Sequence, residues 1–158
     1  MKQLLILVFQ LLLLFIGDVA CKTITGIAPE QAGPETNTND TMSTRISIKT
    51  GSRTFAATLL NNAAVTAFKQ QLPLTLSMKE LNRNEKYAQL PNELPTNAAN
   101  PGTIQSGDLM LYGSNTLVLF YKTFRTSYKY SRLGRIDNPA GLTAALGAGD
   151  VTVTFALE

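Results

Sequence analysis

The sequence predicts an all-β protein, a closed eight-stranded β-barrel with two short α-helices. Three observations support this prediction. Short apolar segments alternating with polar residues recur from residue 45 to residue 158, Gly, Asn and Pro separate them, and only two segments have helical periodicity. So many short strands leave edges that must be hidden, and closing the sheet into a barrel hides them. Each helix is expected to cover one open end.

The eight strands are expected at residues 45–49, 55–59, 72–78, 86–90, 108–112, 116–122, 130–136 and 151–157. The first two form a hairpin through Gly51-Ser52, which suits a type II′ turn because Gly adopts the positive φ required at the first central position. The run 117–121 is apolar without interruption, which predicts a central strand covered on both faces.

Both helices are bounded by residues that favour helix ends. Asn61 or Asn62 is expected to cap the first helix, whose apolar side chains share one face, and Pro73 stops it. In the second helix, Asp137-Asn138-Pro139 has the expected order of cap and first-turn proline, and Gly147 follows the last turn.

The N-terminus has the pattern of a secretory signal peptide over residues 1–20. Lys2 precedes an apolar run over residues 4–16, which is shorter than the ~20 residues needed to span a bilayer as a helix. Cys21 follows small residues, as at the cleavage and acylation site of a bacterial lipoprotein. Asp18 departs from that pattern, so ordinary cleavage with secretion and a retained signal anchor remain alternatives. We expect an extracytoplasmic protein of the bacterial cell envelope anchored by a lipid at Cys21, or otherwise a secreted or periplasmic one.

Residues 21–44 are expected to be a flexible tether to the barrel domain at residues 45–158. The segment from Lys22 to Thr44 contains no aromatic residue and is rich in Thr, so it offers too little apolar surface to offset the entropy of ordering it.

The composition excludes several kinds of site. The chain contains no His and one Cys, which rules out Ser-His-Asp and Cys-His relays, a zinc finger, an internal disulfide and a CxxC redox pair. We expect no cofactor and no metal ion.

Six segments, in their order and spacing, carry a resemblance to a known family. They are residues 55–59, 72–76, 85–87, 107–112, 117–121 and 130–134. Together they resemble the small single-domain cyclophilin-like proteins of bacteria, which are distinct from the prolyl isomerases of the cyclophilin type. The resemblance implies a closed barrel with a groove on one face.

The two segments that would match the isomerase site differ from it. Isomerases have Phe-x-Arg on one strand, where this chain has Tyr87-Ala88-Gln89, and Gln-Gly-Gly-Asp further on, where it has Gln105-Ser106-Gly107-Asp108. A neutral amide at Gln89 loses a charge-assisted hydrogen bond, and losing one preorganised donor costs other enzymes ~10²–10³ in rate. We therefore expect a protein that binds a peptide or small ligand without strong catalysis. The alternative is a weak peptidyl-prolyl isomerase acting on exported proteins.

The expected groove combines aromatic, amide and basic side chains. Its residues are Tyr87, Gln89, Gln105, Phe120, Phe124, Tyr128, Tyr130 and Arg132. Aromatic faces supply contact area, while polar groups fix a ligand's orientation. In the alternative interpretation, the segment 121–132 is cross-strand packing followed by a solvated loop.

Basic residues accompany these aromatics between Lys122 and Arg135, a combination that can bind nucleic acid. An extracytoplasmic location argues against that partner, and a charged hairpin, anionic lipid headgroups or acidic glycans are the alternatives.

The nearby carboxylates, Glu80, Glu85 and Glu93, lack any spacing that shows a glycosidase pair. We expect a monomer whose partners are the groove's ligand and a membrane through the anchor, with no nucleic acid.

Overall fold

The computed structural model describes residues 44–158. The predicted signal peptide, nearly all of the tether and Cys21 lie outside the described residues. The strands and helices are β1 (Arg45–Thr50), β2 (Arg53–Leu59), α1 (Ala63–Lys69), β3 (Leu74–Leu81), β4 (Glu85–Gln89), β5 (Thr103–Ile104), β6 (Asp108–Tyr112), β7 (Thr116–Phe120), β8 (Phe124–Arg125), β9 (Ser131–Ile136), α2 (Leu142–Leu146) and β10 (Val151–Leu157). Within this part of the chain, no helix is long and apolar enough to cross a membrane.

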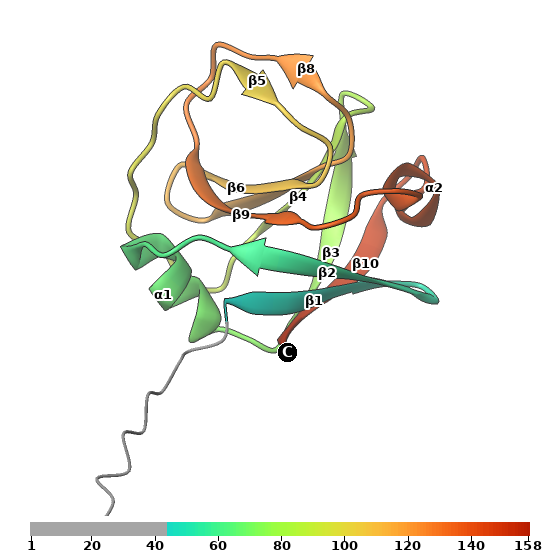
Figure 1. Cartoon of the computed structure of the whole chain (residues 1–158), viewed down its shortest axis with the longest axis horizontal. Helices are drawn as coiled ribbons and strands as arrows, with labels where there is room; N and C mark the ends of the chain where they lie inside the picture. Colours follow the sequence, from blue (N-terminus) through green and yellow to red (C-terminus); the bar gives the residue numbers. More distant parts are fainter. Residues whose placement is uncertain (1–43) are drawn as a thin grey trace, which may run out of the picture. The chain divides into compact units, whose positions relative to one another are not determined.

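Eight of these strands form a closed antiparallel barrel in the order β1-β10-β3-β4-β7-β6-β9-β2, which confirms the predicted fold class. Figure 1 shows α1 and α2 at opposite ends of this barrel, and each sends apolar side chains into its core. The ring of Phe68 in α1 meets Phe155 of β10 edge-on at 6.2 Å between centroids. The sequence did not predict β5 and β8, which form a separate two-stranded sheet over the outside of the barrel.

Two of the predicted turn and cap residues have the expected local conformations. In the turn between β1 and β2, Gly51 has a φ of 55° and Ser52 does not have a positive φ. A type II′ turn requires this combination, with a positive φ at its first central residue only. Asn62 is the cap of α1, where its Oδ1 accepts a hydrogen bond from Val65 N at 2.9 Å.

The predicted start of the second helix is wrong. α2 begins at Leu142, after Gly141, whose φ is 80°. Asn138 accepts from Ala140 N at 3.1 Å and so closes a turn before the helix. Asp137 instead accepts from the Thr58 hydroxyl at 2.7 Å, a partner distant in sequence. The strand predicted at residues 72–78 is also displaced, since β3 runs from Leu74 to Leu81.

Strand β7 is covered on both faces, as its unbroken apolar run predicted. Leu117 and Leu119 belong to the core inside the barrel. Val118 and Phe120 face outward into a second apolar cluster, which also contains Ile104, Met110 and Tyr130. The barrel wall is therefore buried from outside at this strand, beneath the segment that carries β8.

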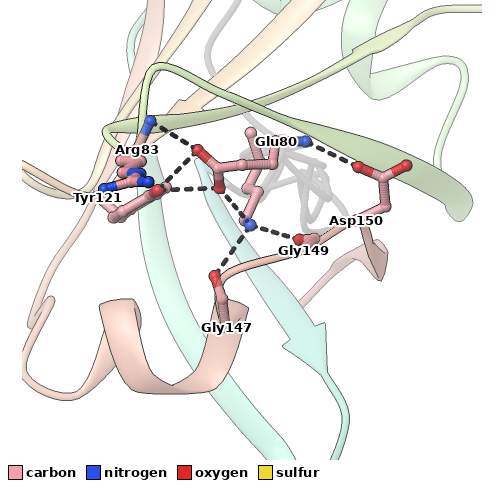
Figure 2. A network of polar contacts seen from close by, with 7 residues as sticks. Glu80, Arg83, Tyr121, Gly147, Gly149 and Asp150 are labelled. Carbon is pink, nitrogen blue, oxygen red and sulfur yellow. Dashed lines mark hydrogen bonds and ion pairs between the residues drawn. The ribbon is translucent and has the colours of Figure 1, made fainter.

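A buried cation bonds to the chain that follows α2, within the network of polar contacts in Figure 2. Lys86 in β4 is fully buried, and its Nζ donates to Glu80 Oε2 at 2.5 Å and to the carbonyl oxygens of Gly147 at 3.0 Å and Gly149 at 2.5 Å. The Tyr121 hydroxyl donates to the same Glu80 carboxylate at 2.9 Å. The network joins β3, β4 and the chain that follows α2.

The electrostatics of this network favour an ionised Glu80. Burial by itself raises the pKa of Glu80, but the hydrogen bonds from Lys86 and Tyr121 outweigh it and hold the pKa below its usual value. Burial, together with the Glu80 carboxylate, raises the pKa of Tyr121 to about 12, so its hydroxyl stays a donor.

We expect Glu80→Gln to lower the free energy of unfolding by roughly 3 kcal/mol, because it leaves the Lys86 charge buried without a counter-ion. Urea unfolding at neutral pH measures this change. Glu93→Gln, which alters an exposed carboxylate, is the control and should change little. Equal losses in the two variants would contradict a structural role for the buried pair.

Candidate functional site

The outer face of β4, β7 and β6 forms the floor of a cavity. Side chains of a strand alternate between its faces, so Glu85, Tyr87 and Gln89 of β4 share the outward side. Their antiparallel partners in β7 are Phe120, Val118 and Thr116.

The segment between β7 and β9 supplies an aromatic wall above this floor. The Tyr130 ring meets Phe120 at 5.5 Å and Tyr112 at 5.7 Å between centroids. Tyr128 extends the series, 6.3 Å from Tyr112, and Phe124 lies 5.7 Å from Phe120 on the other side. Pairing of β8 with β5 and a bridge between Ala99 and Tyr130 hold this segment over the barrel.

Between floor and wall is a cavity of about 550 Å³. It is lined by Leu81, Asn82, Asn84, Glu85, Tyr87, Gln89, Tyr112, Thr116, Val118, Phe124, Arg125, Thr126, Ser127, Tyr128 and Tyr130. We call it the aromatic cavity. Its volume lies in the range of small-molecule sites, and its walls combine rings with a few polar groups, as such sites do.

Five of the eight predicted groove residues line the aromatic cavity. They are Tyr87, Gln89, Phe124, Tyr128 and Tyr130. Tyr128 is 63% exposed at the rim, whereas Tyr130 is buried at the back of the wall. The Gln89 amide donates to the Thr116 hydroxyl at 3.0 Å across the floor.

The other three predicted residues do not line it. Phe120 is fully buried behind the wall. Gln105 lies in the turn before β6, where its amide oxygen accepts from the Thr123 hydroxyl at 3.4 Å. Arg132 lines a second hollow of about 450 Å³ next to α1, and its guanidinium lies 3.8 Å from the buried Asp108 carboxylate.

The sequence interpretation missed Glu85, Asn84 and Tyr112 as members of this cavity. For Glu85 a signal was present, because strand alternation places it on the same face as Tyr87 and Gln89. Tyr112 ends a different strand, and only the register of β6 against β7, which pairs Tyr112 with Thr116, brings it to the cavity.

Glu85 is the most unusual group in the aromatic cavity. It is 8% exposed, and among residues 44–158 its carboxyl group has no hydrogen-bond or ion-pair partner. Burial, and secondly the negative charge of Glu80, raises the pKa of Glu85 to about 7. Burial and the Glu85 charge raise the pKa of Tyr130 to about 12.

Asn84 adds a second acceptor beside Glu85. Its side-chain oxygen is buried and accepts no hydrogen bond from the described residues. Buried polar atoms are nearly always paired, so Asn84 Oδ1 is an exception among the described residues, together with the hydroxyl oxygen of Thr50.

Comparison with known proteins relates the chain to one family. The model of the family described as the Cyclophilin-like family matches residues 48–156. A hypothetical protein from Archaeoglobus fulgidus, known from its solution structure, is similar with a TM-score of 0.50 and 20% sequence identity, over 73% of this chain and 95% of that one. At this identity the likeness shows the fold alone. No curated protein matches the chain.

We expect the stability of the protein to depend on pH through Glu85. The folded pKa, about 7, is above the ordinary value of 4.5, so the folded state binds more protons between these values and stability falls as pH rises through them. Glu85→Gln removes this dependence, and relative to the variant the wild type should lose roughly 3 kcal/mol between pH 4 and pH 8. Urea unfolding of both proteins across this range measures the difference, and parallel curves would contradict the raised pKa.

Proposed function

The chain belongs to the cyclophilin-like family, and we propose that its barrel binds a peptide or small ligand in the aromatic cavity without strong catalysis. One observation supports this function best. A carboxyl group with no partner among the described residues, Glu85, lines a cavity whose wall is built from tyrosine and phenylalanine rings. The Glu85 oxygens are not among the fully buried atoms, so a ligand that enters the cavity can contact them.

The aromatic wall fits binding for a second reason. Tyr112 and Tyr128 are 48% and 63% exposed, although their rings are large enough to pack in a core. Tyrosines of this kind provide much contact area at little cost in side-chain entropy, which is why they are common in binding surfaces. Their exposure leaves apolar area that a ligand would cover.

The residues of the cavity do not favour efficient catalysis. The sequence contains no His to act as a general base or acid near neutral pH. Gln89 is neutral and already donates to Thr116, and Gln105, the second residue matched to the isomerase site, does not line the cavity. The geometry therefore favours a binding module over an isomerase.

We also propose that the protein is exported and anchored in the bacterial envelope through a lipid at Cys21, which rests on the sequence pattern of residues 1–21 alone. Mass spectrometry of the mature N-terminus tests this. An acylated Cys21 would support the anchor, while a chain that begins at Lys22 with a free amine would refute it.

We expect Tyr128→Ala to weaken binding of ligands to the aromatic cavity by about tenfold while leaving the melting temperature unchanged, because this ring is exposed at the rim. The measurement is an amide-shift titration with small aromatic compounds and short peptides. Leu157→Ala removes another exposed apolar side chain, which is 49% exposed and does not line the cavity, and it should bind like the wild type. Identical affinities for all three proteins would contradict the assignment of the site.

We expect the purified domain to isomerise Xaa-Pro peptides no faster than the uncatalysed background, which takes tens to hundreds of seconds. A protease-coupled assay measures this rate, with a known prolyl isomerase as the positive control. Acceleration that disappears in Gln89→Ala would favour the alternative, a weak peptidyl-prolyl isomerase for exported proteins.

A further inference from the structure

We propose that the aromatic cavity selects an organic cation, a protonated amino or guanidinium group, which pairs with Glu85 on the cavity floor. This inference rests on the proposed function, because it assigns the chemical class of the ligand to the same site. It goes beyond that function by giving Glu85 and the surrounding rings a specific binding role.

The position of Glu85 is the first argument. The residue is 8% exposed, its side chain lines the cavity, and no salt bridge or hydrogen bond to it exists within residues 44–158. An ionised carboxylate in such surroundings is costly unless an opposite charge or hydrogen-bond donors compensate it. A ligand cation would supply both.

The fold does not supply that charge from its own neighbouring residues. The ammonium group of Lys86, the next residue, belongs to the inward face of β4 and is bound by Glu80 and two carbonyl oxygens. Arg125 lines the same cavity but is exposed and forms no ion pair with Glu85. Glu80 is itself paired with Lys86, and its negative charge only raises the pKa of Glu85.

The aromatic rings around Glu85 are the second argument. The cavity is lined by Tyr87, Tyr112, Phe124, Tyr128 and Tyr130. The faces of such rings carry negative potential and attract ammonium and guanidinium groups within about 6 Å. Rings and carboxylate therefore favour the same sign of charge in the ligand.

The hydrogen-bonding groups on the floor are the third argument. The Glu85 carboxylate and the buried Asn84 Oδ1 are both acceptors without a donor among the described residues. An ammonium group has three donors and a guanidinium five, whereas a neutral alcohol has one. A cation of either kind can donate more than one hydrogen bond to the Glu85 carboxylate.

Binding should also strengthen as Glu85 ionises. The charged groups near it are Glu80 of β3, which Lys86 pairs, and Arg125 of β8. The titratable tyrosines around it are Tyr87, Tyr112, Tyr121, Tyr128 and Tyr130, of which Tyr121 and Tyr130 have pKa values of about 12 and stay neutral below pH 9. Because the pKa of Glu85 is about 7, its ionised fraction, and with it the affinity for a cation, should increase about tenfold between pH 6 and pH 8.

The experiment compares matched probes that differ only in charge. Phenethylamine and phenethyl alcohol represent a free small molecule, and the amides of acetyl-phenylalanyl-lysine and acetyl-phenylalanyl-norleucine represent a peptide. The affinity of each probe for the full chain is measured by amide-shift titration at pH 6 and pH 8. The proteins compared are the wild type, Glu85→Gln and the control Glu93→Gln.

We expect that at pH 8 the charged member of at least one pair binds about tenfold more tightly than its neutral partner. Glu85→Gln should remove this preference, and Glu93→Gln should keep it. The pair that shows it identifies the source of the cation. Equal binding of charged and neutral probes, or a preference that survives Glu85→Gln, would overturn this inference and leave the proposed function standing. No shift of cavity amides with any probe would overturn both.

Discussion

The structure depends on one constraint, that β7 is hydrogen-bonded along both edges and covered on both faces. β4 and β6 flank it, the barrel core covers Leu117 and Leu119, and an outer cluster covers Val118 and Phe120. The barrel core needs only the inner face. The chain covers the outer face of β7 by folding the segments that carry β5 and β8 over the outside of the barrel wall. The segment that carries β8 and the outer face of β4 and β7 together line the aromatic cavity.

Two adjacent residues of β4 show how strand alternation separates structure from function. Lys86 points inward and is satisfied by Glu80 and by the carbonyl oxygens of Gly147 and Gly149, so its charge contributes to closing one end of the barrel. Glu85 points outward and has no such partners among residues 44–158. Both are buried charged residue types, yet only the second is available to a molecule from outside. Buried groups of the first kind fix a fold, and those of the second kind indicate a site.

Membership of the cyclophilin-like family accounts for the barrel and not for its chemistry. One architecture supports many functions, so the argument for function must come from the site. In this chain, only the first of the two segments matched to isomerase motifs lines the aromatic cavity, since Gln89 lies in it and Gln105 lies in the turn before β6. What remains together is a set of rings, two unpaired acceptors and a rim open to solvent. Such a set recognises a ligand through charge and contact area.

The sequence by itself determined the parts of this protein that depend on neighbours along the chain. Strand alternation, the Gly51 turn, the Asn62 cap and the buried run of β7 follow from local geometry, and the number of short strands predicted the closed barrel that the structure has. It misplaced the start of α2, because Asp137 bonds to Thr58, far away in the chain. The sequence pattern placed Arg132 with the cavity residues and left Glu85 out of them. Which residues share a cavity, and whether a buried carboxyl group has a partner, are decided only when distant segments pack, because both depend on distances that no local pattern encodes.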